Sequence, residues 1–280
     1  MEQLITYFET IPPLHRTLIL VGGITFFWIL EGIIPLFSVR YKKWNHALPN
    51  LFFTLTTIIV NFPLAFLLLK TSDWTVANDF GIINLLPQMP SWLYVVLGVM
   101  LLDLIGAYTA HLVEHKVKPL WMVHLVHHSD HNVDTTTANR HHPFESVIRY
   151  LFTLVGVFVV GAPVGVIMLY QSLSVVLSQF NHANIKLPVK VDKAISWFII
   201  SPDMHKVHHH YKLPYTDSNY GNIFSIWDRL FGTFMELDRD KITYGVDTFP
   251  DEKENSSIKG LLKQPFHKYP KPTKTMEVDF

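Results

Sequence analysis

The stretch WLYVVLGVMLLDLIGAYTAHLVEH, residues 92–115, decides the fold. Its part before His111 is almost wholly apolar and has the length of about 20 residues that a helix needs to cross a bilayer. The stretch ends in His111 and His115, and residues four apart lie on the same face of a helix. It therefore predicts a membrane helix that carries two neighbouring imidazoles at one end.

The rest of the chain extends this prediction to an all-α, multi-span membrane protein. Of its 280 residues 49% are hydrophobic and only 16% are charged, against a usual charged share of about 25% in soluble domains. Two more apolar stretches, about residues 17–38 and 49–69, have the length of a membrane span. A longer one, at about 147–180, is broken at Gly161-Ala162-Pro163 and predicts a membrane hairpin of two helices.

The charges of the connecting loops predict the orientation. Asp73 and Asp79 lie between the second and third spans. Basic residues follow the first span, the third span and the hairpin: Arg40, Lys42, Lys43, Lys116, Lys118, Lys186, Lys190 and Lys193. Because basic loops are retained in the cytoplasm, we expect these connections, and with them nearly every histidine, on the cytoplasmic side.

Composition also excludes several classes of site. The net charge is zero and no basic tract is present, so a nucleic-acid footprint is not expected. The chain has no cysteine, so any metal must be held by imidazole or carboxylate.

Two further histidine clusters accompany the first, WMVHLVHH at 121–128 and SPDMHKVHHH at 201–210. On a helix, adjacent histidines such as His127 and His128 diverge by about 100°, which suits two ions better than one. The eight histidines of the HxxxH box and the two HxxHH boxes also exceed what one ion accepts, about four for zinc and about six for iron. Imidazole suits zinc, copper, iron and nickel alike, so the ligand type alone does not identify the metal. Iron can activate O₂, whereas zinc cannot change its oxidation state.

These boxes resemble those of the fatty acid hydroxylase and sterol desaturase superfamily. Further motifs carry the resemblance: Tyr108 before the first box, TANRHHP at 137–143, FNHAN at 180–184, NYG at 219–221 and WDRLFGT at 227–233. The match covers about residues 95–237, and the order and spacing of the motifs are highly specific.

The resemblance implies a helical membrane protein with a cytosolic di-iron site that uses O₂ to hydroxylate or desaturate a lipid. Electrons would come from a separate donor, cytochrome b5-like or ferredoxin-like, since no flavin, haem or cytochrome segment is recognisable. The implied iron ligands are His111, His115, His124, His127, His128, His182, His205, His208 and His209. Some family members have a further histidine four residues before the position of His182. This chain has Ser178 at that position, which leaves the ligand count open.

Five other residues are expected next to the metal ligands or have an open role: Asp103, Tyr108, His142, Asn181 and Asp228. Asp103 stands inside an apolar span, where an acid usually marks function. It could hold a histidine ring or the Tyr108 hydroxyl, or have a buried structural role. For His142, contact with a ligand, a structural role and ligation all remain open.

The resemblance also divides the chain. We expect N-terminal transmembrane helices over residues 1–94, a hydroxylase-like catalytic region over 95–238 that includes the hairpin, and a polar C-terminal tail over 239–280. Outside the boxes, His15, His46 and His267 are isolated and Glu31 lies within the first span. We expect solvated or interfacial positions for all four. We expect His131 and His210, which lie just beyond the boxes, either to lie at the surface or to contact the ligands.

Two other functions fit parts of the pattern. The segment 111–115 also has the form HxxEH, in which Glu114 would be the general base of a zinc-dependent membrane metallopeptidase. That function leaves the other six box histidines unexplained. A non-catalytic metal-binding membrane protein, a transporter or a sensor, is the second alternative, although transport favours ligands near the bilayer midplane.

Overall fold

A computed structural model describes residues 1–38, 41–249 and 251–269. The regular secondary structure of these residues is helical, with isolated β-bridges and no β-strand, which confirms the predicted all-α class. The longer helices are α1 (Glu2–Glu9), α2 (Pro13–Ile33), α3 (Lys43–Ala77), α4 (Ser91–Asp103), α6 (Lys118–His128), α7 (Pro143–Val160) and α8 (Val164–His182). The shorter helices are α5 (Ala110–Lys116), α9 (Val189–Ile195), α10 (Pro202–His208), α11 (Ile226–Leu230), α12 (Glu252–Asn255) and α13 (Ile258–Lys263). Single turns are η1 (Ile82–Leu85), η2 (Leu104–Thr109), η3 (Thr135–Asn139), η4 (Tyr215–Asp217), η5 (Arg239–Lys241) and η6 (Gln264–Phe266).

Five helical segments of the described residues are long and apolar enough to cross a membrane, so the protein is a multi-span membrane protein. They are Pro13–Ile33, Lys43–Leu85, Ser91–Lys116, Pro143–Val160 and Val164–His182. The second begins before the predicted start at residue 49, because α3 continues through both Pro49 and Pro63. Each proline removes only one backbone donor, and neighbouring helices and polar side chains make that loss tolerable in a membrane helix.

The predicted hairpin is present as α7 and α8, which meet at Gly161. Gly161 has φ of +75°, and a Cβ there would lie 2.1 Å from the carbonyl oxygen of Phe80, so only glycine fits this turn. The Ser72 hydroxyl of α3 donates to the Ala162 carbonyl at 2.9 Å. The tip of the hairpin is therefore fixed to the end of α3.

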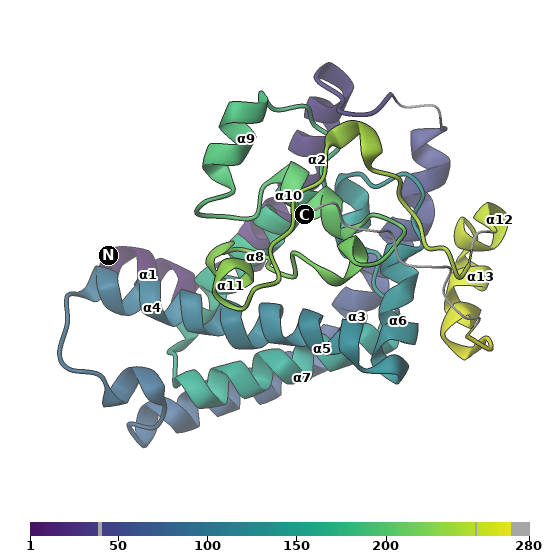
Figure 1. Cartoon of the computed structure of the whole chain (residues 1–280). Coiled ribbons are helices and arrows are strands. Elements are labelled where there is room, and N and C mark those ends of the chain that lie inside the picture. Colours follow the sequence, from purple (N-terminus) through teal and green to yellow (C-terminus); the bar gives the residue numbers. More distant parts are fainter. Residues whose placement is uncertain (39–40, 250, 270–280) are drawn as a thin grey trace.

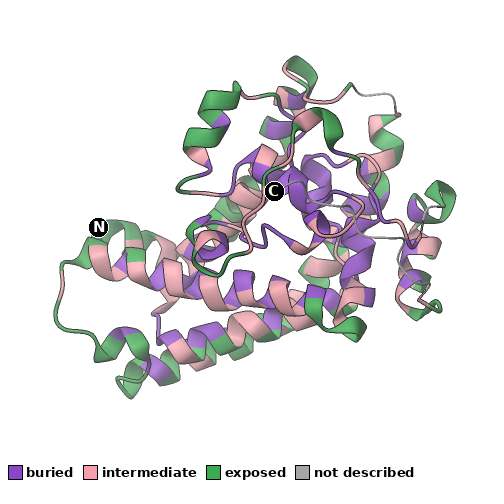
Figure 2. Ribbon diagram, in the orientation of Figure 1, coloured by how far each residue is buried: buried purple, intermediate pink, exposed green. Residues whose placement is uncertain are grey.

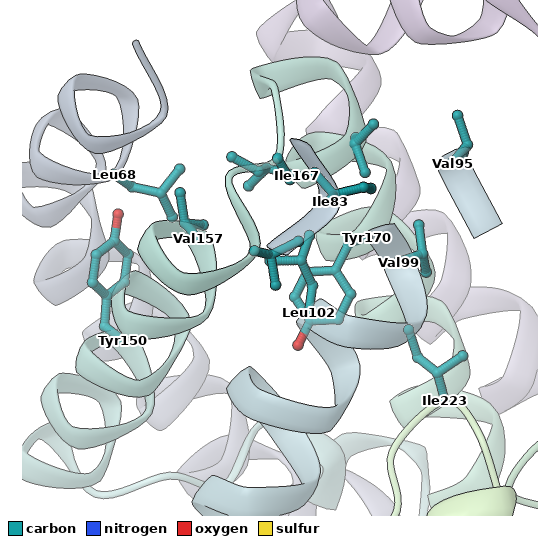
Figure 3. Close-up of a cluster of buried hydrophobic side chains, with 13 residues drawn as sticks. Leu68, Ile83, Val95, Val99, Leu102, Tyr150, Val157, Ile167, Tyr170 and Ile223 are labelled. Atoms are coloured by element: carbon teal, nitrogen blue, oxygen red, sulfur yellow. The ribbon is translucent and has the colours of Figure 1, made fainter. Parts of the chain in front are cut away.

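The spans enclose an apolar core. Helices α4 and α7 run side by side in Figure 1. Between them and α8 lie buried residues that include Val99, Val157 and Ile167 (Figure 3). Because lipid is as apolar as these side chains, close van der Waals packing rather than removal from water holds α4, α7 and α8 together.

The third span is interrupted by a π-helical turn, η2, between α4 and α5. In this turn the Thr109 hydroxyl donates to the Leu104 carbonyl at 2.8 Å. A π-turn inserts a residue into the helix and so re-aims the side chains that follow it, which is why such turns are frequent at functional sites. Here it directly precedes His111.

Beyond the spans, α6 and the segments from α9 to α13 cover the histidine-bearing helix ends. Figure 2 shows buried residues concentrated around α10, whereas α9 and α12 are largely exposed. The described part of the C-terminal segment 239–269 packs on this region, since Leu261 is buried against Phe53 and Val126. Residues 270–280 of the predicted tail lie outside the described residues.

Candidate metal centre

Nine of the 16 histidines form two adjoining groups, in each of which the candidate ligand atoms lie within 4.8 Å of one another. Group A contains His111, His115, His124, His128 and His208. Group B contains His127, His182, His205 and His209. All nine side chains are at most 8% exposed, so both groups are shielded from bulk water.

Helix geometry divides neighbouring histidines between the groups. His127 and His128, at the end of α6, belong to groups B and A, and their ring planes are 83° apart. His208 and His209, at the end of α10, divide in the same way. Because adjacent residues of a helix point about 100° apart, one short HH pair serves both groups.

The spacing of the nitrogens fits a shared cation. Six Nε2 pairs within the groups lie 3.0 to 3.2 Å apart. Two imidazoles bound at about 2.1 Å to one ion lie about 3.0 Å apart when their bonds meet at a right angle and about 3.4 Å in a tetrahedron. The observed separations are in the range expected for imidazole nitrogens that share one ion.

The opposite ring nitrogens determine which lone pairs face inward. His111 donates its Nδ1–H to the Tyr220 carbonyl at 2.8 Å, and His124 donates its Nδ1–H to the Glu145 carboxylate at 2.7 Å. Their Nε2 atoms, 3.1 Å apart, therefore present two lone pairs to each other rather than a hydrogen bond. Such a contact is repulsive unless a cation lies between the nitrogens.

Three further rings are oriented through Nδ1. His208 donates to the Ser218 carbonyl at 2.6 Å, and its buried Nε2 has no hydrogen-bond partner among the described residues. His182 donates to the Ser178 carbonyl at 2.8 Å, and His115 lies 3.3 Å from the Asp217 carboxylate. Ser178, which stands where some family members have a histidine, thus contributes its carbonyl to the site. Partners of this kind fix the tautomer of metal-binding histidines and raise their basicity.

Burial keeps the rings neutral and so able to bind a metal. It lowers the pKa of His124 to about 3, even though the Glu145 carboxylate opposes this shift. Burial, together with neighbouring imidazoles, lowers the pKa values of His128, His205 and His208 well below the ordinary value. A neutral imidazole retains the lone pair that a metal requires.

A buried charge network behind group A was not predicted. Glu145 is fully buried and also contacts Arg149 at 3.0 Å and His141 at 2.9 Å. Arg149 in turn pairs with Glu114 at 2.8 Å. The available signal was an acid and a base four residues apart, Glu145 and Arg149, at the start of an otherwise apolar span, since buried charges require partners.

This network also determines the position of Glu114. Its carboxylate lies 3.9 Å from the Nδ1 atom of His124, on the side of that ring turned away from group A, and it is paired with Arg149. A peptidase base would instead have to reach a water bound among the Nε2 atoms of group A. This arrangement disfavours the metallopeptidase alternative.

Asp103 and Asp228 both stabilise the segment that contains Tyr220. Asp103 accepts the backbone N–H of Phe224 at 3.2 Å and the indole N–H of Trp227 at 3.0 Å. It thus has a structural role and holds neither a histidine nor Tyr108. Asp228 accepts the backbone N–H of Tyr220 at 2.8 Å and so fixes the residue whose carbonyl orients His111.

The other residues expected near the ligands form hydrogen bonds with groups outside the nine histidines. The Tyr108 hydroxyl bonds to Thr233 at 2.9 Å. Asn181 donates to the Asn222 carbonyl at 3.3 Å. His142 accepts the backbone N–H of Phe144 and caps α7, and it belongs to neither histidine group.

Two residues expected to be solvated or interfacial instead contact the interior of the protein, so that expectation was wrong for Glu31, which is fully buried, and for His46, whose side chain is 9% exposed. Glu31 is fully buried and accepts the backbone N–H groups of Thr135 at 2.7 Å and Asn184 at 2.9 Å. His46 lies 2.9 Å from the Asp130 carboxylate. Both residues connect the N-terminal helices to the loop after α6, a contact over long sequence separation that no local pattern reveals.

Comparison with known proteins agrees with this geometry. The fatty acid hydroxylase family model matches residues 95–233, which include all nine histidines. The ornithine lipid hydroxylase OlsE of Rhizobium tropici is 27% identical over 179 residues, covering 64% of this chain and 52% of that protein. The alkylglycerol monooxygenase of Homo sapiens is 25% identical over 254 residues, covering 88% of this chain and 52% of that protein. The methylsterol monooxygenase 2-2 of Arabidopsis thaliana is 25% identical over 228 residues, covering 79% of this chain and 82% of that protein.

This chain spans about half the length of the first two of these relatives. No solved structure matches it. The family model, the relatives and the histidine motifs agree with one another. The chain belongs to the fatty acid hydroxylase superfamily.

Proposed function

We propose that the protein is a membrane-bound, O₂-dependent lipid hydroxylase in which groups A and B each hold one iron ion. The contact between His111 and His124 carries this proposal, because their facing Nε2 lone pairs, 3.1 Å apart, require a cation. The buried, unpartnered Nε2 of His208 supports it further. Imidazole binds iron well, and the family's relatives are oxygenases by name.

The iron pair would supply the redox chemistry that couples O₂, two electrons and two protons to the conversion of a lipid C–H bond to C–OH, with release of water. The protein's own contribution is positioning and exclusion of solvent. The Tyr220 and Ser218 carbonyls fix the rings of His111 and His208. Because the site is dry, it protects a reactive oxidant from quenching by water.

A lipid substrate follows from the names of the relatives and from the membrane spans. The relatives are described as acting on an ornithine lipid, an alkylglycerol and a methylsterol, which share long apolar skeletons. All three names denote oxygen insertion, which favours hydroxylation over desaturation for this chain. Electrons are supplied by a separate cytochrome b5-like or ferredoxin-like donor.

The site faces the cytoplasm in this proposal. Lys116 ends the third span and Lys118 follows it, at the end that carries His111. Asp73 and Asp79 lie near the opposite end of the spans, at the end of α3 and just after it. Positive charge beside the histidine-bearing ends supports a cytoplasmic site.

Comparative lipidomics tests the function. Cells that produce the wild-type chain should contain one lipid class enriched in species with one added oxygen atom, and cells that produce His128→Ala should lack it. His267→Ala is the matched control, because His267 is exposed and lies outside both groups. Identical lipid profiles for the wild type and His128→Ala would count against the proposal.

Glu114→Gln separates the proposal from the peptidase alternative. A peptidase that uses Glu114 as its base loses activity in this variant. An oxygenase retains oxidised product, because Glu114 contacts Arg149 rather than the interior of group A. Loss of product with full metal content in Glu114→Gln contradicts the assignment made here.

A further inference from the structure

The surface around α9 and α11 exposes an unusual amount of apolar side chain for a region outside the membrane spans. We define the α9–α11 patch by five residues: Trp197, Phe198, Ile226, Leu230 and Phe231. Their exposed fractions range from 45% to 76%. Within the short helix α11, Ile226 and Leu230 are four residues apart and so project from the same face, opposite the buried Asp228.

Contacts between the two segments make the patch continuous. The guanidinium of Arg229 stacks over the Trp197 ring at 4.6 Å and donates to the Ser196 carbonyl at 2.9 Å. The Ser225 N–H donates to the Phe198 carbonyl at 3.3 Å. The two exposed aromatic residues after α9 therefore lie beside α11.

The patch adjoins a membrane span. Phe231 stacks on Tyr108 with ring centroids 5.4 Å apart, and Tyr108 belongs to the π-turn of the third span. Trp227 packs in the same cluster as Tyr108, together with Leu104. The exposed face of α11 therefore lies next to the histidine-bearing end of the third span.

Basic residues border the patch. Lys190 and Lys193 are exposed on α9, which Figure 2 shows as largely solvent-accessible, and Arg229 lies within the patch. The acid of α9, Asp192, is buried and accepts from the Ser201 hydroxyl at 2.6 Å, so it does not offset the lysines at the surface. The exposed Glu236 lies 3.4 Å from Lys193 and offsets part of that charge. Exposed tryptophan next to lysine and arginine is the typical composition of a surface in contact with lipid headgroups.

We infer that the α9–α11 patch is a monotopic membrane contact: the five apolar side chains enter the acyl boundary and the lysines of α9 bind anionic headgroups. The patch would fix the angle between the histidine-bearing region and the bilayer. The inference depends on the membrane spans and not on the iron chemistry, so it can fail or succeed independently of the proposed function.

The absence of native cysteine permits a direct test by spin labelling. Phe198→Cys and Leu230→Cys, each labelled with a nitroxide, are placed in nanodiscs of phosphatidylcholine with phosphatidylglycerol. The control is Asp240→Cys, on the exposed turn η5. Collisions with O₂, which concentrates in lipid, and with a water-soluble nickel chelate are measured by electron paramagnetic resonance, and unchanged metal content verifies folding.

The expected result is that the Phe198 and Leu230 labels collide with O₂ and lose their collisions with nickel, whereas the Asp240 label does the reverse. Replacing Lys190 and Lys193 by glutamine should reduce the depth of the Phe198 label in phosphatidylglycerol nanodiscs but not in pure phosphatidylcholine. Nickel accessibility equal to that of the Asp240 label overturns the inference. Protection from both reagents with dipolar broadening between labels also overturns it, since the patch would then bind a second copy of the chain.

Discussion

Replacing Glu145 by glutamine removes one negative charge from the outer side of His124. The carboxylate accepts the Nδ1–H of His124 at 2.7 Å, and both side chains are fully buried, so the bond is charge-assisted and unscreened by solvent. Loss of such a partner typically weakens metal binding by about 10- to 100-fold. That range corresponds to about 1.4 to 2.7 kcal/mol of binding free energy. Only group A contains His124, so the ion in group B should be little affected.

Anaerobic titration of the metal-free protein with Fe(II) against a competing chelator measures this effect. The wild-type chain should bind two ions, and Glu145→Gln should show one binding step weakened by the stated factor and one unchanged. Glu236→Gln is the matched control, because the Glu236 side chain is 62% exposed and pairs only loosely with Lys193 at 3.4 Å. If Glu145→Gln bound both ions as tightly as the wild type, the inferred role of Glu145 would be refuted.

Three further predictions follow from the same geometry. His128→Ala should reduce the metal content of group A, and His209→Ala should reduce that of group B, because each ring belongs to one group. Elemental analysis should find about one ion per chain in each variant. Two ions per chain in both variants would contradict the division of the histidines into two groups. Asp228→Asn should destabilise the protein by about 1–3 kcal/mol in chemical unfolding, since the buried Asp228 carboxylate accepts the Tyr220 N–H at 2.8 Å; an unchanged unfolding midpoint contradicts that role. The metal-free protein should lose stability as the pH falls below about 6.5, the ordinary pKa of histidine. Burial lowers the pKa of His124 to about 3 in the folded chain, so below pH of about 6.5 the unfolded chain binds more protons than the folded chain. A melting temperature that stays constant from about pH 8 to about pH 5 would contradict this linkage.

The spans and the division of the histidines could be predicted from the sequence because both follow from local rules. A run of about 20 apolar residues can satisfy its backbone in a bilayer only as a helix. Likewise, His127 and His128 must diverge on any helix, and the structure places them in different groups.

The sequence did not reveal the partners of the rings. The carbonyls of Tyr220 and Ser218 orient His111 and His208, but a backbone carbonyl leaves no mark in the residue types. Glu145 is brought to His124 by the packing of α7 on α6, across 21 positions of sequence. Such contacts depend on tertiary structure, so the periodicity of the sequence could not predict them.

Local backbone irregularities were equally hidden. The π-turn η2 lies in a stretch whose apolar pattern suits an ordinary helix, and α3 continues through Pro49 although proline usually ends a helix. In both places packing against neighbouring helices outweighs the local preference. The π-turn matters more, since it directly precedes His111 and the first histidine box.

The central claim is that groups A and B hold a pair of iron ions, and Mössbauer spectroscopy of protein grown in ⁵⁷Fe and purified anaerobically tests it most directly. We predict two irons per chain, in two sites with nitrogen-rich coordination that both change when reduced protein meets O₂. A single iron per chain, or zinc at full occupancy with an active enzyme, would contradict the account.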